Sequence, residues 1–305
     1  MAEPGALEEL ASSGRLDEIR VGARRHAEQF RLPLRNRTWR GQTGDFAGAS
    51  IGSSLDFHDH RSYLAGDDPR HINWQAYART GNYTMKQYRE EVRPLIDLVF
   101  DVSASMFLTP AKATRSIELF YFVIEAAWQE AASIAVFLVH GNQFFRMSEE
   151  ALHGHEWYQD RTRQLTPADP SEAPAIGKIP FRAGSMRVLL SDLLFPGQVE
   201  AIAATLSQRQ GRPIILAPFC RDESDADWSG NHEFIDCELA THHLRRVDER
   251  LLKRYHTAYE RHFDFWRAMS QKHGALCCRV PAEAAFDEAI RLEAVAGGAV
   301  EFGIL

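Results

Sequence analysis

The sequence predicts an α/β protein with a mainly parallel central sheet and helices on both faces. First, the short and almost continuous apolar runs at 95–100, 134–139 and 187–194 have the length of buried strands. Second, segments of helical periodicity alternate with these runs. Third, 305 residues, of which 45% are hydrophobic, suffice to bury a sheet between two helical layers.

The N-terminal region is expected to hold one helix and then a small β-rich or irregular segment. Residues 5–29 place Leu, Ile and Ala at helical spacing, and the Gly- and Ser-rich residues 41–54 predict a loop. Residues 55–91 alternate imperfectly and are rich in aromatic side chains, which predicts short strands and turns. We therefore expect residues 1–91 to pack on a main α/β domain of residues 92–305.

Strands and helices are expected to alternate through the main domain. The expected strands are 95–100, 134–139, 144–147, 187–194, 213–219, 233–239 and 275–280. The expected helices are 111–132, 149–165, 198–209, 243–273 and 282–294, with a Pro-rich loop at 167–180. In such sheets, sites form at the carboxyl ends of the strands, above all where the strand order reverses.

Composition excludes several classes of protein. With 35 Lys and Arg against 42 Asp and Glu, the net charge of −7 disfavours general nucleic-acid binding. No apolar run approaches the roughly 20 residues of a membrane span, and the N-terminus lacks the features of a signal peptide. We therefore expect a cytoplasmic protein without a membrane span. The first helix ends in an Arg-rich stretch, which is either a solvated face or a basic patch for an acidic partner.

Polar oxygen donors follow two of the expected strands directly. Asp101, Ser103 and Ser105 lie at alternate positions after the first strand, and Ser191 and Asp192 come directly after the apolar residues 188–190 of a later strand. Carboxylate and hydroxyl oxygens suit Mg²⁺ or Mn²⁺. The alternative is helix capping, in which a Ser caps the next helix and Asp101 bonds backbone amides.

Two stretches of the sequence resemble known families. Asp101-x-Ser103-x-Ser105 after an apolar strand resembles the metal-ion-dependent adhesion site of von Willebrand factor A domains. The preceding segment is similar to the signature of the bacterial domain-of-unknown-function family 58, with Asn73 where that family usually has Asp. The signature residues are Arg61, Tyr63, Gly66, Asp67, Asp68, Arg70, Trp74 and Arg79.

This resemblance, over roughly residues 20–240, implies a von Willebrand A-like, Rossmann-like main domain. It implies a further metal ligand from a loop Thr, for which Thr166 is the candidate and Thr162 the alternative. It also implies a non-enzymatic adaptor that works with a MoxR-type AAA+ ATPase in the assembly or maturation of a complex. Mg²⁺ or Mn²⁺ is the expected cofactor, and no organic cofactor is expected.

The charged and aromatic signature residues have two possible roles. They form either a network of charge-assisted hydrogen bonds packed against aromatic rings, or a pocket for a peptide or an anionic ligand.

Other motifs carry competing functions. The alternative to an adaptor is a metal-assisted hydrolase at Asp101, Ser103 and Ser105, although no general base is evident in the sequence. The Gly-x-Ser-x-Gly motif at 48–52 lacks the strand and helix that a serine hydrolase needs around it. His58 and His60 are expected to be exposed or hydrogen-bonded, and the four Cys residues are expected to be unpaired thiols.

Overall fold

The computed structural model describes residues 6–34, 56–64, 69–89, 93–155, 157–159 and 164–303, with backbone alone at 56–61, 71 and 85–89. The chain divides into two compact units, one of Met1–Asn36 with Pro94–Leu305 and the other of Arg37–Arg93. The N-terminal helices, which the sequence grouped with residues 1–91, thus belong to the larger unit. The reason is that both of them pack against a long helix of that unit.

The larger unit is built on a six-stranded sheet. In spatial order its strands are β11 (Leu276–Pro281), β8 (Arg212–Phe219), β7 (Met186–Leu190), β4 (Leu95–Asp101), β5 (Ser133–His140) and β6 (Gln143–Arg146). All neighbours are parallel except β6, which runs antiparallel to β5. The predicted α/β fold class is therefore confirmed.

The strand order reverses beside β4. From β4 the chain builds outward to β5 and β6, then crosses to β7 on the other side and builds outward to β8 and β11. The carboxyl ends of β4 and β7 therefore meet at a topological switch point, where sheets of this kind form their sites. This order and the antiparallel edge strand define a von Willebrand A-like arrangement.

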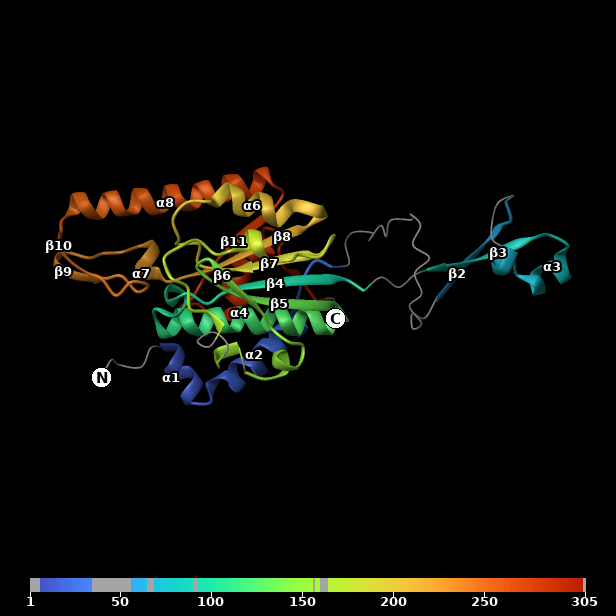
Figure 1. Cartoon of the computed structure of the whole chain (residues 1–305), viewed down its shortest axis with the longest axis horizontal. Helices are drawn as coiled ribbons and strands as arrows, with labels where there is room; N and C mark the ends of the chain where they lie inside the picture. The colour runs from blue at the N-terminus through green and yellow to red at the C-terminus, as the bar shows by residue number, and fades with distance from the viewer. Residues whose placement is uncertain are drawn as a thin grey trace. The chain divides into compact units, whose positions relative to one another are not determined.

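Helices cover both faces of the sheet (Figure 1). One face is covered by α6 and α8, and the other by α4 with α1 and α2 packed on its outer side. The helices of this unit are α1 (Ala6–Ser12), α2 (Arg15–Gln29), α4 (Pro110–Gln129), α6 (Val199–Ser207), α7 (Arg221–Ser224), α8 (Glu249–Lys272) and α9 (Phe286–Ile290). Because α4 lies between the sheet and two helices, it is apolar on nearly all sides.

Short elements complete the larger unit. The strands β1 (Phe30–Arg31) and β12 (Glu301–Phe302) pair antiparallel, and β9 (Gly230–Ile235) forms a hairpin with β10 (His242–Val247). Single helical turns lie at η2 (Ala104–Phe107), η3 (Glu150–His153), η4 (Ile176–Lys178), η5 (Gln208–Gln210) and η6 (Arg291–Val295).

The smaller unit holds an antiparallel strand pair, β2 (Asp56–Ser62) and β3 (Thr84–Arg89). Between them lie η1 (Pro69–His71) and α3 (Trp74–Thr80). The expected strands and turns are present, and α3 is an addition that its seven residues made hard to detect. Asn73 caps α3, since its side chain accepts a hydrogen bond from the Ala76 amide at 3.1 Å.

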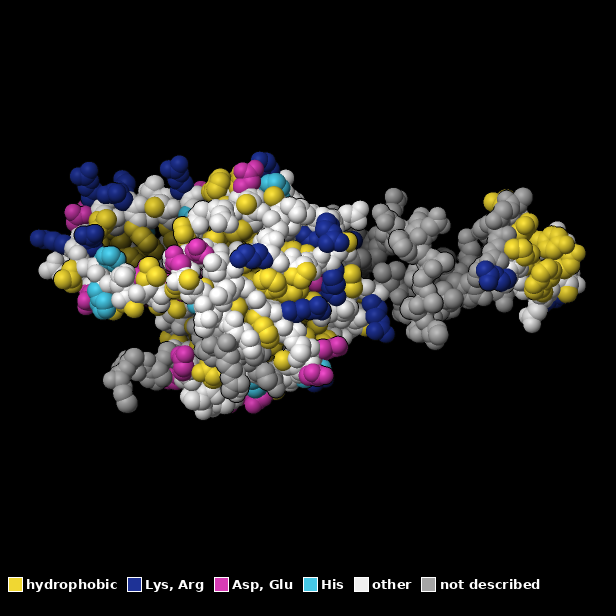
Figure 2. All heavy atoms as spheres, viewed as in Figure 1, with side chains coloured by type: hydrophobic (Ala, Val, Ile, Leu, Met, Phe, Trp, Pro, Cys, Tyr) yellow, Lys and Arg dark blue, Asp and Glu magenta, His cyan; other side chains and the backbone are white. Residues whose placement is uncertain are grey.

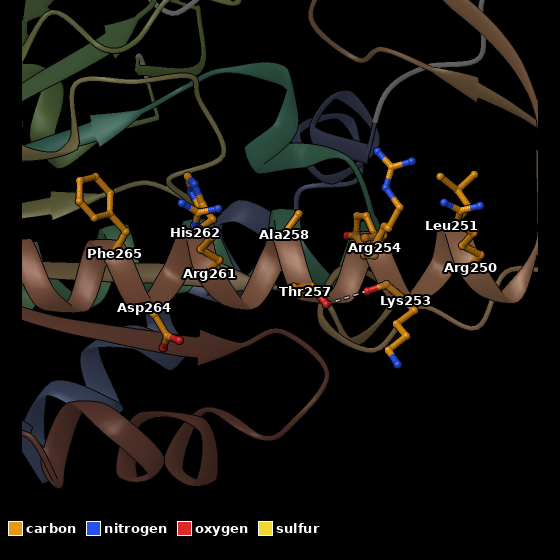
Figure 3. A pocket seen from close by; sticks show the side chains of 11 residues that line it. Arg250, Leu251, Lys253, Arg254, Thr257, Ala258, Arg261, His262, Asp264 and Phe265 are labelled. Carbon is orange, nitrogen blue, oxygen red and sulfur yellow. Dashed lines mark hydrogen bonds between the residues drawn. The ribbon is translucent and has the colours of Figure 1, made fainter.

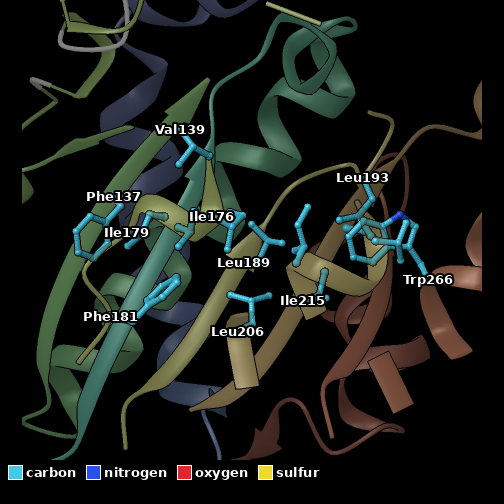
Figure 4. Close-up of a cluster of buried hydrophobic side chains, with 14 of the residues drawn as sticks. Phe137, Val139, Ile176, Ile179, Phe181, Leu189, Leu193, Leu206, Ile215 and Trp266 are labelled. Carbon is cyan, nitrogen blue, oxygen red and sulfur yellow. The ribbon is translucent and has the colours of Figure 1, made fainter. Parts of the chain in front are cut away.

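The core on the α6 and α8 face joins the strands to both helices (Figure 4). Leu189 and Ile215 from adjacent strands pack with Leu206 of α6 and Trp266 of α8. All four residues are fully buried. Because both faces of the sheet are covered, its central strands β4 and β7 are buried along nearly their whole length and are made mostly of apolar residues. This is why these strands could be predicted from apolar runs alone.

Four predicted helices differ from the structure. The helix predicted at 5–29 is two helices, α1 and α2, and of the one predicted at 282–294 only Phe286–Ile290 is α-helical, with η6 after it. Of the helix predicted at 243–273, residues 243–247 belong to strand β10, and α8 begins only after Asp248, whose carboxylate accepts the Leu251 amide at 2.7 Å. Of the helix predicted at 149–165, the described residues form η3 and one further turn at 157–159. Among the helices that the structure describes, none has the length and apolarity to cross a bilayer.

Candidate metal centre

The C-terminal end of β4 places Asp101 at the switch point of the sheet. Its side chain is only 2% exposed. One carboxylate oxygen, Oδ2, accepts the hydroxyl of Ser191 at 2.7 Å, and the other accepts the amide of Ser103 at 3.0 Å. Ser191 follows β7 directly, so the two central strands meet at this carboxylate.

The two predicted hydroxyl ligands lie beside each other after Asp101. The hydroxyl oxygens of Ser103 and Ser105 are 3.2 Å apart. Ser103 occupies the N-cap position of η2, but its side chain makes no capping hydrogen bond. The capping interpretation therefore explains the hydrogen bond from the Ser103 amide to Asp101. It does not explain the two hydroxyls, which leaves them as candidate metal ligands.

A buried lysine accompanies the second predicted carboxylate, Asp192. Lys112, in the first turn of α4, is 0% exposed and donates to Asp192 at 2.8 Å and to Glu223 of α7 at 2.5 Å. Burial alone would lower the pKa of this lysine, but the two carboxylates outweigh burial and raise the pKa above its usual value. Lys112 is therefore a fixed cation inside the cluster.

In the part of the chain that the structure describes, no such cation contacts Asp101. Burial, and then the negative charge of Asp192, raise the pKa of Asp101 to about 6, against the opposing effect of hydrogen bonds from Ser191 and Ser103. The carboxylate is thus held by neutral donors only.

The β9–β10 hairpin brings one more carboxylate to this edge of the sheet. Glu238, between the two strands, accepts the amide of Ser105 at 2.9 Å through one oxygen. Its other oxygen lies 3.4 Å from Nε2 of His140, at the end of β5. The hairpin is thereby fastened to the loop that carries the two serines.

These groups line a cavity of about 720 Å³. Asp101, Ser103, Ser105 and Asp192 all open into it, so the structure brings these four predicted residues together. Six carboxylate side chains take part in the lining, and no Lys or Arg does: Asp101, Glu172, Asp192, Glu223, Asp236 and Glu238. A set of oxygen donors with excess negative charge fits Mg²⁺ or Mn²⁺.

The hydroxyls are essential to this candidate. Within the described part of the chain, no group of three or more His, Cys, Asp or Glu is arranged to hold a metal ion. A metal centre here depends on Ser103 and Ser105 beside the Asp101 carboxylate.

Thr166, the predicted loop ligand, does not join this cluster. It is exposed and is not among the residues that line the cavity. Its backbone is instead held by the side chain of Gln143, which accepts the Thr166 amide at 2.9 Å and donates to the Thr166 carbonyl at 3.1 Å. The same loop reaches the cavity further on, with Ser171 and Glu172. The alternative, Thr162, lies outside the described residues.

The signature residues lie in the smaller unit. Arg61 is part of β2, Arg70 of η1, and Trp74 and Arg79 of α3, while Gly66, Asp67 and Asp68 lie outside the described residues. Trp74 is 58% exposed, and Arg79 donates to the carbonyl of Gln75 at 3.3 Å.

Aromatic rings gather around these residues. Tyr77 and Tyr83 stack at 4.4 Å between ring centroids, and Tyr63 lies 6.1 Å from Tyr83. A hydrogen bond with Tyr77 raises the pKa of Tyr83. Whether the signature is a structural network or a ligand pocket stays a prediction.

Of the remaining motif residues, Cys237 lines this cavity, and several others lie outside the described residues. Residues 48–52 and the side chains of His58 and His60 are not described. The four cysteines are free thiols. Burial raises the pKa of the Cys220 thiol to about 11, as it does for Cys277.

Sequence reasoning missed Lys112, Glu223 and Glu238. A signal existed for Lys112, because a cation in the first turn of a helix opposes the helix dipole and calls for a nearby carboxylate. Glu223 and Glu238 reach the site from a short helix and a hairpin, so only the tertiary fold brings them there.

The sheet order and the strand-end cluster define a von Willebrand A-like domain with a candidate metal centre. The chain belongs to the family described as "Protein of unknown function DUF58", whose model matches residues 59–264, more than half of the chain. This confirms the family that the signature residues indicated.

Two solved structures are similar to this chain at low identity. The conserved hypothetical protein BatB from Bacteroides thetaiotaomicron has 9% identity and a TM-score of 0.36, covering 68% of this chain and 98% of that one. An aerotolerance-related membrane protein from Bacteroides fragilis has 12% identity and a TM-score of 0.32, covering 59% and 98%. No curated protein matches this chain.

Proposed function

We propose that this protein is a non-enzymatic binding module that uses a divalent cation to hold an acidic group of a partner protein. The observation that carries the proposal is the charge balance at the switch point. Asp101, Asp192 and Glu223 meet a single ammonium, that of Lys112. Uncompensated buried carboxylates are costly, and a divalent cation supplies the missing positive charge.

Asp101, Ser103 and Ser105 are the residues that would hold Mg²⁺ or Mn²⁺ directly. Asp192 is better suited to act through a bound water. Its Oδ2 accepts the Lys112 ammonium at 2.8 Å, which would repel a cation bound directly, whereas the donors to Asp101 are the neutral Ser103 amide and Ser191 hydroxyl. A site that keeps water ligands is typical of Mg²⁺.

The acidic lining explains why binding would need the cation. Without it, six carboxylates around the cavity repel an incoming Asp or Glu. With it, a partner carboxylate completes the coordination shell. We further propose a MoxR-type AAA+ ATPase as the partner, supported by membership of the family and by the resemblance of the signature residues.

Binding suits the site better than catalysis. A metal-assisted hydrolase needs a general base beside the reacting water. Asp192 is engaged by Lys112, and both oxygens of Glu238 have partners within the site. The hydrolase alternative predicts Mn²⁺-dependent hydrolysis of a phosphate ester by the wild type that Asp101→Asn abolishes, and such turnover would overturn the binding proposal.

Calorimetry of Mg²⁺ and Mn²⁺ binding tests the cation site. The wild type should bind one ion, Asp101→Asn should not, and Glu260→Gln should bind as the wild type does. Glu260→Gln is the matched control, because it removes one carboxylate from an exposed position of α8. No heat from wild type and control alike would contradict the proposal.

Co-purification from the native cell tests the partner. The ATPase should be recovered with the wild type in Mg²⁺, and lost on chelation or with Asp101→Asn. If no such ATPase is recovered after crosslinking, the proposed partner is wrong, although the calorimetric result for the cation would still stand.

A further inference from the structure

A long, open groove runs along α8 and adjoins the cavity of the candidate metal centre, because Tyr255 lines both. Its volume is about 1260 Å³, and its lining side chains all come from α8. Figure 3 shows Leu251, Ala258 and Phe265 on one side of the helix, with Arg254 beside them. Lys253 and Asp264 point to the opposite side.

The floor of the groove is an apolar stripe. Leu251, Ala258 and Phe265 follow one another at intervals of seven residues, about two helical turns, so they share one face of α8. Phe265 is 48% exposed and Ala258 is also exposed, so this face of α8 presents apolar side chains to solvent. Spacing of this kind is what a second helix needs for packing along the first.

One rim of the stripe is cationic. Arg250, Arg254 and Arg261 are exposed, and within the described residues none of the three has an ion pair or a side-chain hydrogen bond. The one acidic lining residue, Asp264, is paired with Arg267 at 3.0 Å. Figure 2 shows Lys and Arg side chains gathered along α8 and around the adjacent hairpin. Positive charge is thus concentrated here in a chain whose net charge is −7.

The other rim is fixed to the body of the unit. The Tyr255 hydroxyl donates to the Glu223 carbonyl at 2.7 Å, and Nε2 of His262 lies 2.8 Å from the Leu193 carbonyl. These bonds hold α8 in place, so the groove is preformed and ligand binding would not carry the entropy cost of ordering this helix.

We propose that this groove binds an acidic amphipathic helix of a partner protein. The apolar side of that helix would pack on Leu251, Ala258 and Phe265. Its Asp or Glu residues would pair with Arg250, Arg254 and Arg261. This is helix-in-groove recognition with charge complementarity along one edge.

A nucleic acid fits the surface less well than an acidic helix does. An anionic bilayer is a competing partner for an apolar and cationic helix face, and the experiment with vesicles tests it. A nucleic acid would bring its phosphates toward the carboxylates of the adjoining cavity, since Tyr255 lines both cavities. Helix binding in the groove needs no cation at Asp101, so the two sites can be tested separately.

A fluorescent helical peptide tests the groove on the full-length chain. The probe is an amphipathic peptide of about three heptads with Leu at the apolar positions and Glu on its flanks, and binding is measured by fluorescence anisotropy. Wild type should bind it, with affinity falling as salt rises. The Arg254→Glu and Arg261→Glu double variant should bind at least tenfold more weakly.

Matched controls separate specific from general charge effects. Arg15→Glu with Arg146→Glu makes the same charge change at exposed positions of α2 and β6 and should bind as the wild type does. Asp101→Asn, and chelation, should leave peptide binding unchanged. Equal losses in both double variants would overturn the proposal. So would equal binding of a peptide with Lys flanks, or stronger binding to phosphatidylserine vesicles or single-stranded DNA than to the Glu peptide.

Discussion

Strand β4 carries two buried aspartates, Asp97 near its start and Asp101 at its end, and the fold treats them in opposite ways. Asp97 is 0% exposed, and its carboxylate accepts Nε and the amide of Arg182 at 2.7 and 2.9 Å, together with the Ser185 hydroxyl at 2.7 Å. Asp101 is almost equally buried but meets only neutral donors, with Asp192 as a charged neighbour.

The difference indicates that Asp97 has a structural role and that Asp101 is available for binding. The guanidinium of Arg182 neutralises Asp97, so that carboxylate fastens the start of β4 to the loop before β7. At the other end, Lys112 pairs with Asp192 and Glu223, and among the described residues no cationic side chain pairs with Asp101. A charge left uncompensated at the switch point is what a cation-binding site requires in its free state.

The largest expected effect on the free energy of unfolding comes from replacing Lys112, the lysine near the Asp101 end of β4. Lys112→Met leaves Asp192 and Glu223 buried without a cation and should lower the free energy of unfolding by about 4 kcal/mol, measured in urea. Lys253→Met, at an exposed position, is the control and should change it by less than about 0.5 kcal/mol. Should Lys112→Met fail to fold, the double variant with Asp192→Asn should recover part of the loss. A loss of less than 1 kcal/mol would show that Lys112 is not needed for charge balance.

Asp97→Asn should be the next most damaging change. It removes the charge that neutralises Arg182 and should cost about 3 kcal/mol, less than Lys112→Met because Arg182 is 28% exposed and can draw on water. Asp101→Asn, in the absence of metal, should not lower the free energy of unfolding, since it removes a buried charge that has no counterion. Equal destabilisation by the two variants would erase the distinction between the two ends of β4.

Addition of metal should stabilise the protein only through the Asp101 end of β4. Mg²⁺ at one hundred times its Kd should raise the free energy of unfolding of the wild type by about 2.7 kcal/mol. The same addition should leave Asp101→Asn unchanged. Thermal unfolding in the presence of Mg²⁺ and of a chelator gives the measurement, and a shift that is the same in both proteins would place the ion elsewhere.

The smallest expected effect belongs to the hairpin. Glu238→Gln keeps an acceptor for the Ser105 amide but removes a partly exposed negative charge, so Mg²⁺ affinity should fall by about threefold. Glu233→Gln, on the same hairpin and exposed, should leave the affinity unchanged. Calorimetry distinguishes them, and an increase in affinity with Glu238→Gln would mean that this carboxylate blocks the site.

The strands and their polar ends could be predicted because their signal is local. A strand of a parallel sheet is buried on both faces, so β4 and β7 appear as apolar runs, and the residues that follow them must lie at the same edge. Asp101, Ser103, Ser105 and Asp192 were located in this way, without a structure.

The rest depends on contacts between distant segments. Glu238 reaches the site through a hairpin that was partly predicted as helix, because His243–Val247 adjoins the periodic pattern of α8. Asp248, which caps α8, was the local signal for the true boundary. The position of Thr166 outside the cavity lining also depends on a contact between distant segments, because the side chain of Gln143 holds the Thr166 backbone.

The sequence of the smaller unit interrupts that of the larger unit, which has a consequence for synthesis. Helices α1 and α2 leave the ribosome before α4, the helix on which they pack, and α4 follows only after residues 37–93 have been made. Until then their apolar sides have no native surface to cover, and an early-emerging segment of this kind is exposed to chaperones and proteases. Once α4 appears, the intervening residues add little to the entropy of closure, because that cost grows only with the logarithm of loop length.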